Sequence, residues 1–124
     1  KVAIIVPSVL FGLVHILGMG FNLLSCVLVL VAGTMVGIMF SLIASETGSI
    51  WNSAIVHAIW NMIIIGGFLW VGAKFDKYSL FSYVLDTKSF LLTGGEFGIE
   101  SSIVAVIGYS LVCAFVVLSK KKKQ

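Results

Sequence analysis

Apolar residues run through three long stretches of the chain without any Asp, Glu, Lys or Arg. The charge-free stretches cover residues 2–45, 49–72 and 101–119. About 20 apolar residues are enough to cross the hydrocarbon core of a bilayer, so the first stretch is too long for one crossing and must turn once. The pattern therefore predicts several apolar helices joined by short breaks.

Turn residues divide the first stretch, where Gly18-Met19-Gly20-Phe21-Asn22 supplies two glycines and an asparagine. We expect helices over residues 4–17, 23–44, 49–72 and 99–118, with Ser49 as an N-cap. Residues 73–98 form an extramembrane loop in which 78–85 alternate weakly, as a short interfacial strand or helix would. The predicted fold is all-α: a polytopic transmembrane helix bundle with about four membrane-spanning helices, in one unit over residues 1–124.

The composition supports a membrane location. Of the 124 residues, 60% are hydrophobic and 10% charged, against about 45–50% and about 25% in soluble domains. A mean hydropathy of +1.16 agrees. Too few residues can face water for a free-standing soluble domain, a disordered chain or a nucleic-acid-binding protein. Membrane lipid is therefore an expected partner, and nucleic acid is not.

Lysines predict the orientation of the helices. Four of the eight basic residues form one run at positions 120–123, and cytoplasmic flanks are enriched in Lys and Arg. We therefore expect a multi-pass protein of the cell membrane with a cytoplasmic C-terminus and the 73–98 loop on the other side. Trp70, Tyr78 and Tyr83 suit an aromatic belt at that interface.

Four histidine and asparagine side chains lie within the predicted spans, where such groups are costly and need a partner or a function. They are His15, His57, Asn52 and Asn61. His57 and Asn61 are one helical turn apart on one face. If Pro7 marks the start of the first helix and Ser49 caps the third, each histidine lies eight residues further in, so the two imidazoles can meet at one depth.

Other residues have simpler interpretations. Each histidine could instead make one interhelical hydrogen bond and nothing more. Asn52 and Ser53 suit capping or packing, and the glycines at 33 and 37 suit close helix approach. Cys26 and Cys113 lie in apolar runs, so we expect neither a disulfide framework nor a thiolate metal site. The sequence contains no HExxH motif.

Three short motifs resemble the CAAX protease and bacteriocin-processing family of intramembrane proteases, also called CPBP or Abi. They are Phe11-Gly-Leu-Val-His15, which matches FxxxH; Thr47-Gly48-Ser49-Ile50-Trp51; and His57-Ala-Ile-Trp-Asn61, which matches HxxxN. The resemblance covers about residues 7–62, and the last predicted helix fits the family's final segment.

The family's first motif, EExxxR, has no counterpart, because the chain contains no Glu-Glu pair and no Arg. The chain therefore resembles the C-terminal part of such a protein, whose N-terminal helices and catalytic glutamate are missing, and we expect it to be inactive alone. The resemblance implies an endopeptidase acting on a membrane-associated peptide or protein. It implies catalytic roles for His15, His57 and Asn61, with Phe11 packing beside the site, and His15 and His57 as ligands if a divalent metal such as zinc is used.

Two other functions compete with this hypothesis. One is a non-catalytic membrane protein of the same fold, such as a bacteriocin self-immunity factor or a peptide-export partner, in which the histidines are structural. The other is a transporter fragment with a proton-coupled histidine pair.

Overall fold

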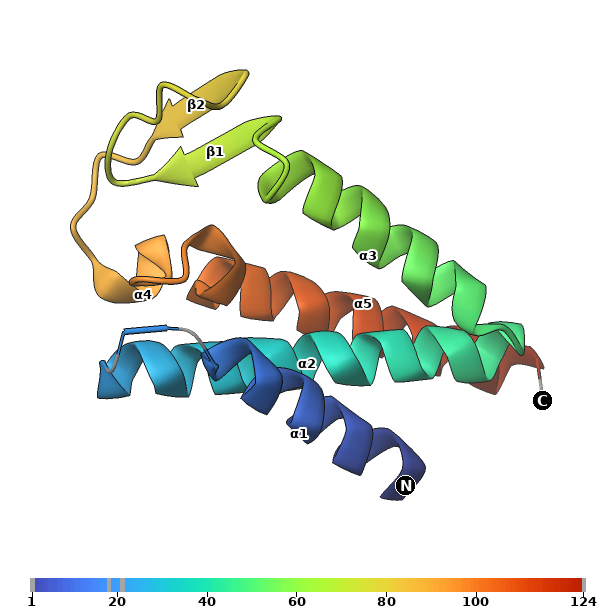
Figure 1. Cartoon of the computed structure of the whole chain (residues 1–124). Helices are drawn as coiled ribbons and strands as arrows, with labels where there is room; N and C mark the ends of the chain where they lie inside the picture. The colour runs from blue at the N-terminus through green and yellow to red at the C-terminus, as the bar shows by residue number, and fades with distance from the viewer. Residues whose placement is uncertain (1, 18, 21, 124) are drawn as a thin grey trace.

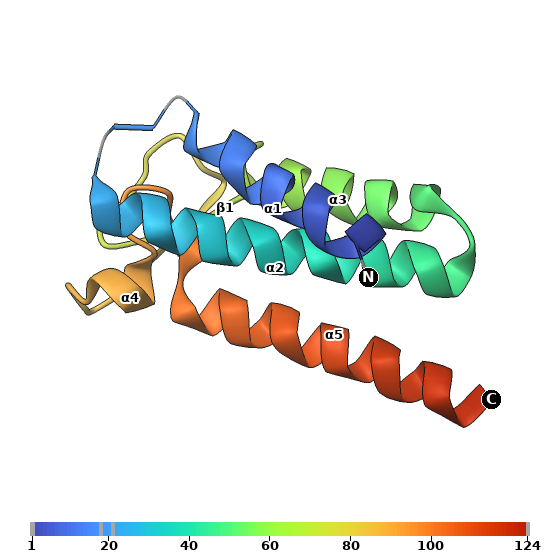
Figure 2. The same ribbon diagram turned by 90° about the horizontal axis from the view of Figure 1, so that it is seen from below.

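The chain is mostly helical in the computed structural model, which describes residues 2–17, 19–20 and 22–123, with the side chains of 122 and 123 left aside (Figure 1). The elements, in order, are α1 (Val2–Ile16), α2 (Leu23–Thr47), α3 (Ile50–Ile64), β1 (Leu69–Gly72), β2 (Phe81–Val84), α4 (Phe90–Thr93), the 3₁₀ turn η1 (Ile99–Ser101) and α5 (Ile103–Lys123). The long helix α2 lies at the centre, with α1 and α3 along one side of it and α5 along the other (Figure 2).

Small residues bring α1 and α2 into close contact. A Cβ added to Gly33 would lie 2.7 Å from the Cα of Gly12, and one added to Gly37 would lie 2.6 Å from the Cα of Ser8. Ser8 is fully buried, and its hydroxyl donates to the Ile4 carbonyl at 2.6 Å. The packing role predicted for the two glycines of α2 is confirmed, and α1 supplies matching small residues at the same spacing.

A tight turn folds α3 back along α2. Gly48 ends α2 in the left-handed conformation at φ 68°, and Ser49 caps α3 by accepting a hydrogen bond from the Trp51 backbone. The Ser53 hydroxyl then donates to the Phe40 carbonyl of α2 at 2.8 Å. The predicted cap at Ser49 is confirmed, and Ser53 holds one face of α3 against α2.

The helix predicted over 49–72 is wrong beyond Ile64. α3 ends at Ile64, and residues 69–72 form β1, which pairs in parallel with β2 in the register Leu69 to Phe81. Gly66 and Gly67 follow the helix, and Gly67 is left-handed at φ 76°. Two glycines in succession favour a break over a further helical turn. The fold is therefore mostly helical rather than all-α, and within residues 78–85 the strand alternative is right.

The other predicted boundaries are closer to the structure. Asn22 caps α2 by accepting from the Ser25 backbone at 3.0 Å, although Gly18 and Phe21 of the predicted turn lie outside the described residues. The helix predicted over 99–118 begins with η1, after which Ser102 caps α5 by accepting from the Ala105 backbone at 3.1 Å. The predicted loop 73–98 contains β2 and the short helix α4.

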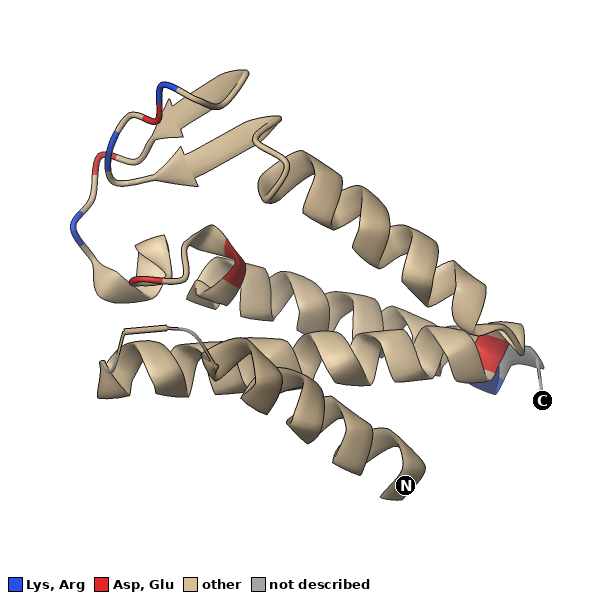
Figure 3. Cartoon of the chain, viewed as in Figure 1, with Lys and Arg blue, Asp and Glu red and all other residues tan. Residues whose placement is uncertain are grey.

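Two helices, α2 and α5, are long and apolar enough to cross a membrane, while α1 and α3 have 15 residues each. Fifteen residues make a helix of about 22 Å, shorter than the roughly 30 Å hydrocarbon core, so the count of four spans is not confirmed. Large apolar side chains are exposed along α1, α3 and α5, as expected for helices that contact lipid rather than water. The described charged residues gather at the two ends of the bundle, with none between (Figure 3). These features are those of a helical membrane protein.

Candidate active site

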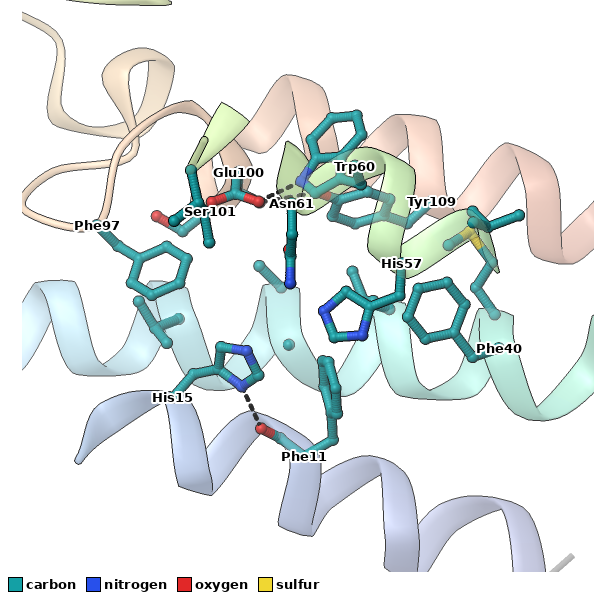
Figure 4. A pocket seen from close by; sticks show the side chains of 17 residues that line it. Phe11, His15, Phe40, His57, Trp60, Asn61, Phe97, Glu100, Ser101 and Tyr109 are labelled. Carbon is teal, nitrogen blue, oxygen red and sulfur yellow. Dashed lines mark hydrogen bonds between the residues drawn. The ribbon is translucent and has the colours of Figure 1, made fainter. Parts of the chain in front are cut away.

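A cavity of about 120 Å³ lies between the helices, toward the end of the bundle that bears the 65–98 segment. Most of its wall is apolar, and α1, α2, α3, η1 and α5 all contribute to it. The polar side chains that line it are His15, His57, Asn61, Glu100, Ser101 and Tyr109 (Figure 4). Both histidines of the chain thus reach one cavity, although they are 42 positions apart in the sequence (57 minus 15).

His15 is held by its own helix. Its Nδ1 lies 2.6 Å from the carbonyl oxygen of Phe11, one turn earlier. A carbonyl can only accept, so Nδ1 donates in this contact, and in the neutral form of the ring Nε2 then carries the lone pair. The imidazole also packs edge-on against Phe97, with ring centroids 6.0 Å apart.

Phe11 contacts both imidazoles. Its ring centroid lies 4.5 Å from that of His15 and 5.5 Å from that of His57. Phe40 of α2 also packs against the His57 ring, with ring centroids 5.4 Å apart. Aromatic contacts at these distances fix ring orientation as well as position. The two histidines are therefore held around one shared phenyl ring.

His57 and Asn61 share a face of α3 with Ser53, and the hydrogen bond from Ser53 to α2 turns that face inward. The Asn61 amide points into the space between the two imidazoles (Figure 4). Pro7 does not mark the start of the first helix as supposed from the sequence, because it lies inside α1, which already includes Val2. The histidines share a cavity because the small residues of α1 and α2 set the helix crossing, not because Pro7 starts a helix.

The comparison with known families fits this geometry. Residues 1–63 match the family model described as type II CAAX prenyl endopeptidase Rce1-like. The chain belongs to this Rce1-like family. The match includes FxxxH on α1 and HxxxN on α3, whose side chains line the cavity together. No curated protein and no solved structure matches the chain.

Three polar residues of the cavity in this Rce1-like chain, Glu100, Ser101 and Tyr109, were not among the site residues predicted from the sequence. Glu100 stands on η1, outside the matched segment, and its carboxylate accepts a hydrogen bond from the indole Nε1 of Trp60. Tyr109 donates to the Glu100 backbone carbonyl at 3.2 Å. The only sign of Glu100 in the sequence was that an acidic residue lies at the edge of a predicted lipid-spanning stretch. Trp60 also lines the cavity and orients this acid through its indole N–H.

The described residues do not make a complete metal site. Catalytic zinc usually has three protein ligands, and among the described residues no group of three His, Cys, Asp or Glu side chains could hold a metal ion. The cavity of the Rce1-like chain offers two imidazoles. A metal ion bound there would need a further ligand from outside the described residues. Cys26 and Cys113 are free thiols on α2 and α5 and do not line the cavity.

Proposed function

We propose that this chain is the C-terminal part of an intramembrane endopeptidase that hydrolyses a peptide bond in a membrane-associated peptide or protein. The observation that carries the proposal is the convergence of His15, His57 and Asn61 on one mostly apolar cavity. Membership of the Rce1-like family supports the same reaction class. We further propose that the catalytic glutamate lies on helices N-terminal to this chain and that the chain alone is inactive.

The chemistry needs an activated water and a stabilised oxyanion. In the proposed reaction the upstream glutamate and the two imidazoles orient the water, and the free Nε2 of His15 can accept a proton. Water attacks the scissile carbonyl, and the amide of Asn61 donates a hydrogen bond to the developing oxyanion. In an apolar cavity such a donor can contribute about 3 kcal/mol to the transition state. The proton returns to the leaving amine as the C–N bond breaks.

If the protein uses a divalent metal, we propose one arrangement of ligands for it. Neutral imidazole suits zinc, so His15 through Nε2 and His57 would supply two ligands and an upstream carboxylate the third. The hydrogen bond from Nδ1 to the Phe11 carbonyl is the kind of contact that orients a histidine ligand. The metal would supply Lewis acidity.

The proposed setting is the cell membrane, crossed several times, with a cytoplasmic C-terminus. α1 and α3 would then cross together with α2 and α5, in a bilayer that is locally thinned to match their shorter length. The described part of the lysine run lies at the end of the bundle opposite the cavity-bearing end (Figure 3).

The deciding experiment uses the full-length protein, with its natural upstream sequence, in proteoliposomes. Two sets of quenched-fluorescence peptides are offered, one with a prenylated cysteine before the scissile bond and one without. We expect cleavage of at least one set, and loss of more than about 100-fold in kcat on His57→Ala. Membrane insertion of the variant should be unchanged.

The control variant is Trp51→Phe on the same helix, whose side chain is 71% exposed and does not line the cavity. It should cleave at the wild-type rate. Equal cleavage by wild-type protein and His57→Ala would contradict the proposal and favour a non-catalytic immunity or export role. Proton-driven flux in the same liposomes without cleavage would favour a transporter.

A further inference from the structure

Glu100 places one acidic group in a cavity whose other polar side chains carry an amide, hydroxyls, an indole and imidazoles. We propose that Glu100, together with the indole of Trp60, binds a cationic group of the substrate: the ammonium or guanidinium of a Lys or Arg side chain, or a free amino terminus. The proposal rests on the proposed function and adds a substrate preference to it.

The backbone around Glu100 is firmly anchored. Ser101 is fully buried, and its hydroxyl contacts the carbonyls of Gly94 at 2.6 Å and Gly98 at 3.1 Å. The Tyr109 hydroxyl donates to the carbonyl of Glu100 itself. Because these bonds tie η1 to α5 and to the preceding loop, the Glu100 side chain starts from a fixed point at the cavity wall.

The Glu100 carboxylate is oriented by a hydrogen bond but has no ion-pair partner among the described residues. Trp60 donates its indole N–H to Oε1, while Oε2 accepts no hydrogen bond from the residues that the structure describes. The chain has no Arg and no Lys between positions 2 and 73 or between 89 and 119, so no basic side chain of those segments is available to pair with Glu100. A carboxylate against apolar walls attracts a cation far more strongly than the same group does in water.

Trp60 suits the same ligand. Its side chain is 39% exposed and lines the cavity beside Glu100. An indole face next to a carboxylate attracts ammonium and guanidinium groups through its quadrupole. Apolar walls around this corner would hold the methylene stem of a Lys or Arg side chain. The arrangement therefore favours a long basic residue over an acidic or short polar one.

The test measures binding without cleavage, in full-length His57→Ala protein in nanodiscs of phosphatidylglycerol. The probes are apolar nine-residue peptides with capped ends, in matched pairs. The two peptides of a pair differ at one position, which is Lys in one and norleucine in the other, and this position differs from pair to pair. Binding is followed on the Trp60 indole ¹⁵N–¹H signal, identified by its loss in Trp60→Phe. We expect Lys peptides to bind at least about tenfold more tightly than norleucine peptides at one or two positions.

The decisive variant is Glu100→Gln, which keeps an oxygen acceptor for the Trp60 indole and removes only the charge. It should abolish the preference for Lys. The matched control is Glu96→Gln, four residues earlier in the same segment, exposed and not part of the cavity lining, which should preserve the preference. A second variant, Trp60→Phe, retains the charge and should keep a preference, read by competition with a fluorescent peptide.

Several outcomes would overturn the proposal. Equal binding of Lys and norleucine peptides to the wild-type background would do so, as would a Lys preference that survives Glu100→Gln. If only phosphatidylethanolamine added to the nanodiscs shifts the Trp60 signal, the cation is a lipid headgroup and not a peptide. None of these results depends on catalysis, whereas failure of the proposed function appears in the cleavage assay, as absent cleavage by the wild-type protein or as equal cleavage by His57→Ala.

Discussion

Asn61 is the polar cavity residue for which a mutation can most simply distinguish a chemical role from a packing role. Its amide points between the two imidazoles and is half-buried (Figure 4). Asn61→Ala in the full-length protein should lower kcat by about 10² to 10³-fold with little change in KM, because the amide would act mainly on the oxyanion of the transition state.

Asn52→Ala is the matched control, since Asn52 is exposed near the start of the same helix and does not line the cavity. Its kcat should equal that of the wild type. A large rise in KM for Asn61→Ala with kcat unchanged would mean that the amide binds the substrate rather than the transition state.

The histidine and asparagine positions were predictable because helical spacing alone places residues four apart on one face. Phe11 and His15, and likewise His57 and Asn61, follow this rule. Glu100 does not, since its place in the cavity depends on a 3₁₀ turn and on a hydrogen bond to a residue 40 positions away. No local pattern contains that information.

At the scale of elements, the crossing of α1 over α2 determines whether the two histidine-bearing helices reach one cavity. Gly33→Val should separate these helices, because even the first added carbon would lie 2.7 Å from the Cα of Gly12. We expect the free energy of unfolding to fall by about 1–3 kcal/mol. Reversible unfolding in mixed micelles would measure it.

Gly108→Val on α5 is the control for this substitution, since a Cβ there meets nothing within 4 Å. Its unfolding free energy should change by less than that of Gly33→Val. Equal losses in the two variants would mean that the cost comes from valine in an apolar helix and not from the α1–α2 contact.

The turn between α2 and α3 depends on backbone conformation rather than on space. Gly48 has φ 68°, and an added Cβ would meet no atom within 4 Å. Gly48→Ala should therefore lower the free energy of unfolding by about 1 kcal/mol, the cost of the left-handed conformation for a residue with a side chain. Gly48→Asn should cost less, because asparagine adopts this conformation more readily. The same micelle unfolding assay compares them, and an order with Asn worse than Ala would contradict this explanation.

Helix ends were predicted well where a capping residue marks them. The end of α3 was predicted poorly because the predicted helix continued past the pair Gly66-Gly67. Ser49 and Asn22 accept backbone hydrogen bonds as N-caps. Gly66 and Gly67 end α3 early, and β1 then gains a partner strand, β2, from beyond the intervening loop. Apolar character alone does not distinguish a buried helix from a short strand.

At the scale of the whole molecule, charge is segregated to the two ends of the bundle (Figure 3). In a variant of the full-length protein whose native cysteines, here Cys26 and Cys113, are replaced by Ala, Lys77→Cys should react with an impermeant maleimide in intact cells. Lys121→Cys should react only after permeabilisation if the proposed orientation holds, because cytoplasmic flanks are enriched in Lys and Arg. Gel-shift labelling measures both.

Labelling of the two sites in the opposite order would reverse the proposed orientation. Labelling of both sites in intact cells would mean that they lie on the same side of the membrane. An unlabelled protein would be tested again after denaturation, which exposes both thiols and serves as the control for reactivity.

The sequence by itself determined that this is a helical membrane protein. The composition of a charge-free stretch suffices to make its helix apolar, and a turn residue affects only its immediate neighbours in the chain. The spacing in the sequence also marked the residues of the FxxxH and HxxxN motifs. Only the tertiary structure decided the pairing of β1 with β2 and the place of Glu100 beside Trp60. These features depend on contacts between distant segments, which follow from how the helices pack and not from any residue's neighbours in the chain.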